Sequence, residues 1–173
     1  MELHVLIEER RWLEINLRKI LSGVIKSVLS FLNNCESNYE ISLLASNDKN
    51  ISELNKKYRN VRSATNILSW PEYSLKNLLP GKMPKTLPVP GNGNSTISLG
   101  NLAIAYETCK KEAKINGISL ESHMSHILLH GFLHLVGFDH HNDLDAELME
   151  GIEVSLLSSL GIPNPYNLRE FNR

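Results

Sequence analysis

The sequence predicts an α+β fold, in which a small mixed sheet of about four strands packs with about five helices. Two observations support this fold class: four short segments have strand-like patterns, and the segments with helical spacing gather toward the C-terminal half. A chain of 173 residues, 42% of them hydrophobic, can bury one substantial core. A single domain over residues 1–173 is therefore expected.

The strands are expected in segments rich in apolar and β-branched residues. These are residues 3–7 (LHVLI), 39–46 (YEISLLAS), 65–71 (TNILSWP) and 98–105 (SLGNLAIA). In the second segment, alternation places Tyr39, Ile41, Leu43 and Ala45 on one face. Pro71 stops the third, because proline cannot donate to a strand ladder.

The helices are expected where apolar residues recur every three or four positions. The first should span residues 10–32, with an apolar stripe made by Leu13, Leu17, Ile20, Leu21, Val24, Val28 and Leu32. A turn at 46–50 should precede a short helix at 51–60. Further helices are expected at 106–116, from a Ser119 cap to about Val136, and from Asn142 or Asp143 to Gly161. Residues 72–96, rich in proline and glycine, should form a long loop.

Composition excludes several classes of protein. A net charge of −1 with 21% charged residues argues against a disordered chain and against a generally basic surface. A nucleic-acid ligand would need a local basic patch instead. The N-terminal apolar run is too short for a signal peptide, and no stretch is long enough to span a membrane. Cys35 and Cys109 do not suggest a disulfide framework, so a cytoplasmic protein is expected.

The stretch HGFLHLVGFDH, residues 130–140, carries the most chemical information. His130 and His134 are four residues apart, so a helix would turn both imidazoles to the same side. Gly137 can end the helix in a left-handed conformation and bring His140 back to the same point. Three neutral imidazoles with water in the open fourth position are typical of a catalytic zinc site, so one Zn²⁺ per chain is predicted.

Neighbouring residues should support this site. Asp139 could orient an imidazole or contact the bound water. His126 and His123 lie farther up the helix, where packing or supporting roles are expected. The alternative is that His130 and His134 are ordinary surface or core residues, which the third histidine and the glycine argue against.

The same histidine spacing occurs in metzincin proteases, with the pattern HExxHxxGxxH. There the glutamate after the first histidine is the general base for peptide hydrolysis. This chain has Gly131 at that position. The spacing therefore keeps the metal geometry but lacks the proteolytic base. For a phosphodiester substrate, a carboxylate at 131 would place negative charge where the phosphate must approach.

HGFLHLVGFDH resembles the signature H-G-x-L-H-L-x-G-[YF]-D-H of the YbeY family, which are bacterial metal-dependent endoribonucleases. Residues 54–71 (LNKKYRNVRSATNILSWP), 99–105 (LGNLAIA) and 160–166 (LGIPNPY) also resemble family blocks, in the same order. One departure is Asn101, where the family pattern has aspartate. If that aspartate lies near the metal, Asn101 would keep its shape and lose its charge.

The resemblance implies a zinc-dependent endoribonuclease that cuts single-stranded rRNA during maturation and ribosome quality control. It places metal ligation on His130, His134 and His140 and a functional role on Arg59; the predicted catalytic residues are Arg59, His130 and Asp139. The guanidinium fork of Arg59 can grip a phosphodiester, although helix-end arginines are more often simply solvated. Residues 56–62 (KKYRNVR) could track phosphates. The implied partners are the small ribosomal subunit with its proteins and an Era-type GTPase.

Two other functions stay open. One is a metzincin-like peptidase or amide hydrolase, against which Gly131 speaks. The other is a non-catalytic ribosome-assembly factor whose zinc only holds the fold, for which a fourth protein ligand would be evidence. Whether water or a 2′-hydroxyl attacks the phosphorus is also left open by the sequence.

Overall fold

The computed structural model describes residues 1–34, 38–89 and 96–167. Its elements follow the chain in the order β1 (Glu2–Ile7), a 3₁₀ helix η1 (Arg10–Glu14), α1 (Leu17–Phe31), β2 (Tyr39–Ser46), α2 (Asp48–Arg59), β3 (Ile67–Pro71), β4 (Ile97–Ala105), α3 (Tyr106–Ile115), α4 (Leu120–Leu135) and α5 (Asp143–Ser159). The predicted α+β fold class is confirmed, including a mixed four-stranded sheet.

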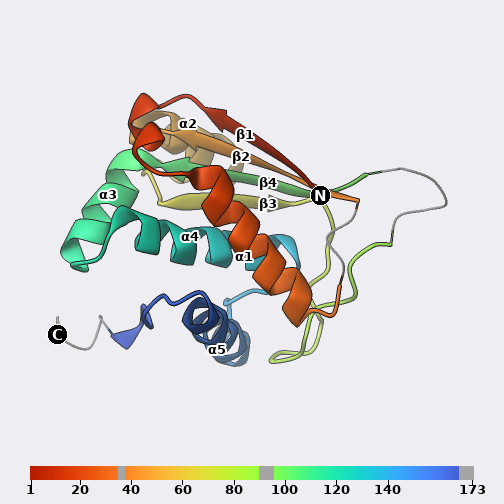
Figure 1. Cartoon of the computed structure of the whole chain (residues 1–173). Coiled ribbons are helices and arrows are strands. Elements are labelled where there is room, and N and C mark those ends of the chain that lie inside the picture. Colours follow the sequence, from red (N-terminus) through yellow and green to blue (C-terminus); the bar gives the residue numbers. More distant parts are fainter. Residues whose placement is uncertain (35–37, 90–95, 168–173) are drawn as a thin grey trace.

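The strands lie in the order β1-β2-β4-β3. β1, β2 and β4 are parallel, and β3 runs antiparallel to β4 at one edge. The chain forms layers: α2 covers one face of the sheet, α1 and α4 cover the other, and α5 lies beyond α4 (Figure 1).

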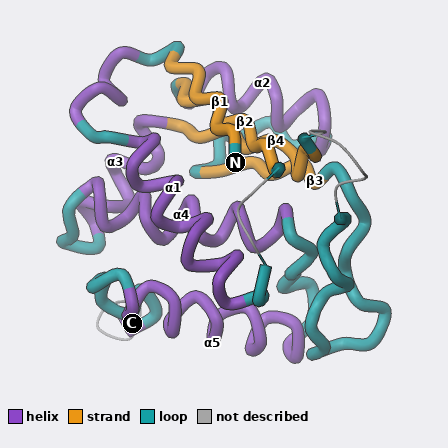
Figure 2. The backbone as a smooth tube through the Cα atoms, turned by 45° about the vertical axis from the view of Figure 1, so that its right-hand side comes forward, coloured by secondary structure: helices purple, strands orange, loops and turns teal. Residues whose placement is uncertain are grey.

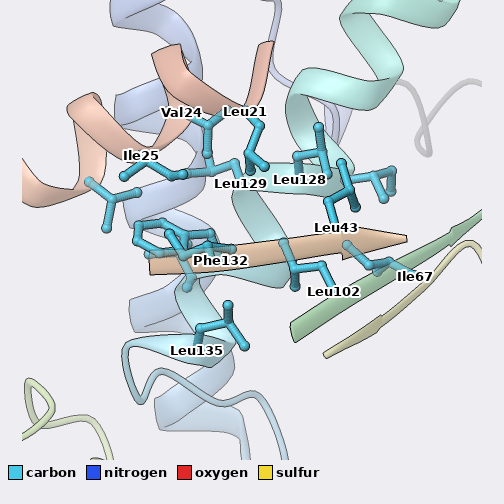
Figure 3. Packing of buried hydrophobic residues seen from close by; sticks show 14 of the residues in the cluster. Leu21, Val24, Ile25, Leu43, Ile67, Leu102, Leu128, Leu129, Phe132 and Leu135 are labelled. Atoms are coloured by element: carbon cyan, nitrogen blue, oxygen red, sulfur yellow. The ribbon is translucent and has the colours of Figure 1, made fainter. Parts of the chain in front are cut away.

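Side chains alternate between the two faces of the sheet along each strand. The clusters that they join on the two faces differ in size. On β4, Leu102 and Ile104 point into the large core, whereas Ala103 and Ala105 face α2 and form a smaller cluster with Ile51. On the large-core side, Phe132 and Leu129 of α4 pack among residues of α1 and the sheet (Figure 3). The sheet thus holds α4 on its more extensively packed face.

α4 is the central helix, between the sheet and α5 (Figure 2). Its apolar residues are buried on several sides, and Leu128, Leu129, Phe132, Leu133 and Leu135 are fully buried. A helix that is apolar nearly all round is stable only inside a protein. The helix that carries the histidine motif is therefore a rigid scaffold, which favours precise placement of a site.

The first helix begins later than predicted. Residues 10–32 do not form one helix, because the chain breaks after η1 and the side chain of Asn16 caps α1 by accepting from the backbone N–H of Lys19. The break buries Trp12, whose indole N–H donates to the carbonyl oxygen of Ser46 at 2.9 Å. Leu13, predicted in the apolar stripe, is instead 68% exposed.

The predicted turn at 46–50 is also wrong in part, because α2 begins at Asp48. The side chain of Asn47 accepts from the N–H of Asn50 and caps the helix. An asparagine before a helix satisfies an otherwise unpaired N–H, so the same residue that suggested a turn starts the helix.

The other boundaries agree with the predictions within a few residues. Ser119 caps α4 and Asn142 caps α5. The described residues of the predicted long loop, 72–89 and 96, contain no helix or strand, and residues 90–95 lie outside the described part. Cys109 is buried without a disulfide, while Cys35 lies outside the described residues. In the described ranges, no helix is long and apolar enough to cross a membrane.

Candidate metal centre

The three histidines of the motif converge. His130 and His134 lie on the last turns of α4, and Gly137 has φ 98°, the left-handed conformation that turns the chain back after the helix. The turn carries His140 to the same point, where one nitrogen from each of the three rings lies within 4.8 Å of the others. The structure therefore brings together the residues that the spacing predicted as metal ligands.

The hydrogen bonds of the rings fit a cation. His130 Nδ1 lies 2.8 Å from a carboxylate oxygen of Glu153, and His134 Nδ1 lies 3.0 Å from the carbonyl oxygen of Phe138. Because these oxygens only accept, each Nδ1 carries a proton, which leaves Nε2 as the nitrogen of each ring that can bind a metal. The two Nε2 atoms are 3.2 Å apart. Two ring nitrogens this close call for a shared proton or a metal ion between them.

The histidine set also matches the ligands of a catalytic zinc. Burial, followed by the neighbouring His130 and His140, lowers the pKa of His134 to about 4. A neutral imidazole is the form that binds a metal. Within the described ranges, no fourth His, Cys, Asp or Glu joins this group. Three imidazoles without a fourth protein ligand fit a zinc site with an open position.

Glu153 of α5 is the residue of this centre that the sequence analysis missed. Its side chain is fully buried and bridges two histidines of α4, with His130 Nδ1 at 2.8 Å and His126 Nε2 at 3.1 Å. The hydroxyl of Tyr166 donates to the same carboxylate. Burial alone would raise the pKa of Glu153, but the hydrogen bonds from His126 and His130 lower it to about 2. The ionised carboxylate thus fixes which nitrogen of His130 carries the proton.

A signal for Glu153 was present in the sequence. It lies among buried residues of α5, next to Ile152 and one turn from Met149 and Leu156. A carboxylate on the apolar side of a helix must find partners once it is buried. The histidines of α4 supply those partners.

Arg59 lies in the same cavity as the three histidines. The cavity has a volume of about 820 Å³ and is lined by Arg59 together with His130, His134 and His140. Arg59 is the last residue of α2 and is exposed. In the described part of the chain, its guanidinium has no hydrogen-bond or ion-pair partner, so it is available to an anion.

Asp139 lines this cavity as well, but the closest partners of its oxygens are not the rings of the three predicted ligands. One accepts from Lys76 Nζ at 2.6 Å, and the other accepts from the backbone N–H of His140 at 2.8 Å. Asp139 therefore fastens the long loop, which carries Lys76, to the segment that presents His140. A catalytic role for Asp139 stays a prediction.

Gly131 faces the sheet rather than the substrate cavity, contrary to the prediction that a side chain at 131 would meet an approaching phosphate. A β-carbon there would lie 2.4 Å from Ile67 Cδ1 and 3.1 Å from Leu102 Cδ2. The glycine is needed because α4 lies close against β3 and β4. Asn101 is also away from the centre: it is an exposed residue of β4 opposite Trp70 and does not line the cavity.

A second histidine–carboxylate pair lies farther along α4. His123 Nε2 is 2.9 Å from an oxygen of Glu112, which also accepts from the amide of Asn66 at 3.0 Å. This pair joins α3 to α4. His123 thus has a structural role, as expected, and His126 contacts Glu153 directly.

Comparisons with known proteins identify relatives of the whole chain. The model of the family described as Endoribonuclease YbeY matches residues 6–161. A protein called Endoribonuclease YbeY from a Ruegeria species is 39% identical over 170 residues, covering 98% of this chain and 99% of its own length. One of the same name from Agrobacterium fabrum is 35% identical, covering 96% and 95%. The fold is similar to a solution structure from Thermotoga maritima, with a TM-score of 0.50, 15% identity, and coverage of 92% and 91%.

Proposed function

The chain belongs to the YbeY family, and on that premise we propose that it is a zinc-dependent endoribonuclease that hydrolyses phosphodiester bonds in single-stranded rRNA. One observation carries the proposal: three imidazoles that can hold a metal share a cavity with an unpaired arginine. A metal and a guanidinium at one phosphate are a recurring way to stabilise charge in phosphoryl chemistry.

His130, His134 and His140 would hold the metal. Zinc bound there would supply Lewis-acid polarisation and a nucleophile available at neutral pH. Glu153 keeps the Nδ1 proton of His130 in place, and the carbonyl oxygen of Phe138 does the same for His134. The chain itself therefore holds two of the predicted ligands in the correct tautomer before any metal arrives.

Arg59 would bind the phosphodiester at the same cavity. Its planar fork can donate two hydrogen bonds to phosphate oxygens and offset the negative charge that builds up during cleavage. The exposed cations Lys56, Lys57 and Arg62 extend this positive charge along the end of α2 and beyond it. A backbone of several phosphates could follow that strip toward the centre.

The same features favour nuclease activity over the other two functions. Gly131 packs against the sheet, so this position supplies no carboxylate base for a peptidase. The lack of a fourth protein ligand in the described ranges favours a catalytic over a structural zinc. We further propose action in rRNA maturation and ribosome quality control in the cytoplasm, with the small ribosomal subunit and an Era-type GTPase as partners.

The test is cleavage of matched single-stranded and duplex RNA by zinc-loaded and chelator-treated protein, with a peptide library as an alternative substrate. The proposal expects cuts within the single strand only when zinc is loaded, and no peptide cleavage. Peptide cleavage, or zinc-loaded protein that binds RNA without cutting it, would refute it.

A further inference from the structure

A second cavity adjoins the candidate metal centre and has no part in the function proposed so far. It has a volume of about 310 Å³ and lies where α5 packs against α4 in the neighbouring layer (Figure 2). His130 and His140 line both this cavity and the larger one that contains Arg59. A strand of RNA with its phosphate at the centre would therefore have a neighbouring nucleotide at the mouth of the second cavity.

The two cavities differ in charge. The larger one has Arg59 and Lys76 on its walls, together with Glu72 and Asp139. The titratable acidic residues of the smaller one are Glu150 and Glu153, and neither lysine nor arginine lines it. Away from the histidines that the two cavities share, this carboxylate wall repels a phosphate and attracts a neutral group with hydrogen-bond donors. The phosphate backbone thus belongs to the first cavity and an uncharged part of the nucleotide to the second.

We propose that this second cavity is a nucleobase subsite that selects bases bearing an amino group over uracil. The inference rests on the proposed function, because it takes RNA as the substrate at the centre. It adds a specificity-determining residue, Glu150, and places one base of the substrate next to the scissile bond.

The size and lining of the cavity suit one base. Pockets for small ligands usually begin at about 300 Å³, so about 310 Å³ accommodates one nucleoside rather than a longer segment. The apolar walls come from the buried side chains of Ile127 and Met149. Tyr166 and His126 add two rings, whose centroids are 5.8 Å apart at an interplanar angle of 76°. Unstacked RNA bases are commonly held against such aromatic side chains.

Glu150 is the acceptor that remains for the base. Both oxygens of Glu153 already accept hydrogen bonds, one from His130 and one from His126 and Tyr166. Glu150 is exposed on α5, and among the described residues its carboxylate has no hydrogen-bond or ion-pair partner. A carboxylate accepts well from the amino groups of cytosine, adenine and guanine. Uracil offers one N–H that is flanked by two carbonyl oxygens, and a carboxylate repels those oxygens.

The main experiment maps every cut that zinc-loaded protein makes in a single-stranded RNA containing all sixteen dinucleotide steps. The wild-type chain should cut about tenfold more often beside amino-bearing bases than beside uracil, on one side of the scissile bond. Glu150→Gln keeps the shape, loses the charge and gains a donor that uracil can use, so the ratio should fall close to one. Glu147→Gln makes the same charge change on an exposed residue of α5 that does not line the cavity, and it should keep the wild-type ratio.

A wild-type enzyme without base preference, or a Glu150→Gln variant with the wild-type ratio, would overturn the subsite. Wild-type protein that cuts no RNA would refute the proposed function instead. The subsite is then decided by titrating zinc-loaded protein with cytidine and with uridine while following the Met149 methyl resonance. Cytidine should shift it, uridine should not, and Ala146→Leu, which fills the cavity, should abolish the shift. Equal responses, or none, would overturn the subsite.

Discussion

Glu153→Gln should weaken zinc binding without changing a ligand. Glutamine has the same shape as glutamate but offers one carbonyl oxygen where the carboxylate offers two. Glu153 now accepts from His130 Nδ1 at 2.8 Å and from His126 Nε2 at 3.1 Å. The amide NH₂ must therefore face one of the two rings. If it faces His130, the ring proton moves to Nε2, the nitrogen that lies 3.2 Å from His134 Nε2 and is predicted to bind the metal.

The expected change in the zinc Kd follows from the hydrogen bond between His130 and the Glu153 carboxylate that is lost. A hydrogen bond to a charged group contributes about 1.5–3 kcal/mol. At about 1.4 kcal/mol per factor of ten, that is roughly a 10- to 150-fold change in a binding constant. Replacing the residues that orient metal-binding histidines generally costs about 10- to 100-fold in affinity. We therefore expect Glu153→Gln to raise the zinc Kd by about 10- to 100-fold.

The assay is competition with a chromophoric zinc chelator at neutral pH, with circular dichroism to verify the fold. Glu112→Gln is the matched control, because Glu112 also pairs with a histidine of α4 but contacts none of the predicted ligands. The control should keep the wild-type Kd. Equal zinc affinity in wild type and Glu153→Gln, or an equal loss in both variants, would show that Glu153 does not act by orienting His130.

Three further predictions concern other parts of the molecule. Arg59→Ala should keep zinc and the fold but slow RNA cleavage by about 10²- to 10³-fold, with poor rescue by lysine; single-turnover rates that match the wild type would return Arg59 to an ordinary solvated residue. Gly131→Ala should lower the free energy of unfolding by about 1–3 kcal/mol, because its β-carbon would lie 2.4 Å from a side-chain carbon of β3. Gly151→Ala, in open space, should raise the free energy of unfolding by up to about 1 kcal/mol. Urea denaturation measures both changes, and equal changes in the two variants would contradict the close packing at Gly131. Partial burial alone would raise the pKa of Glu112, but its hydrogen bonds, chiefly with His123, lower it below the ordinary 4.5. The stabilisation by Glu112 relative to Glu112→Gln should therefore be complete above pH 4.5 and decrease as the pH falls through the lowered pKa, and urea midpoints that differ equally at about pH 7 and pH 3 would contradict this.

The parts of the site that depend on local geometry could be predicted from the sequence. Helical spacing alone turns His130 and His134 to one side, and the left-handed preference of glycine at 137 returns the chain to bring in His140. The alternation of residues 39–46 likewise predicted β2 and its buried face. In each case the information lies in a short continuous segment of the chain.

What the sequence analysis missed depends on contacts between distant segments. Glu153 meets His130 only because α5 packs beside α4, and no spacing in the sequence encodes that contact. Gly131 was misread for the same reason: its position on the helix was known, but the closeness of the sheet was not. The break at Asn16 follows from burial of Trp12 against Ser46, a contact between residues 34 positions apart.

Bound zinc and RNA cleavage should be measured together, in the wild type and in the variant with His130, His134 and His140 all replaced by alanine. We expect one zinc per wild-type chain and cleavage of single-stranded RNA, with both lost in the triple variant while the fold, verified by circular dichroism, remains. Full zinc retention or wild-type cleavage in a folded triple variant would show that these histidines do not hold a catalytic zinc.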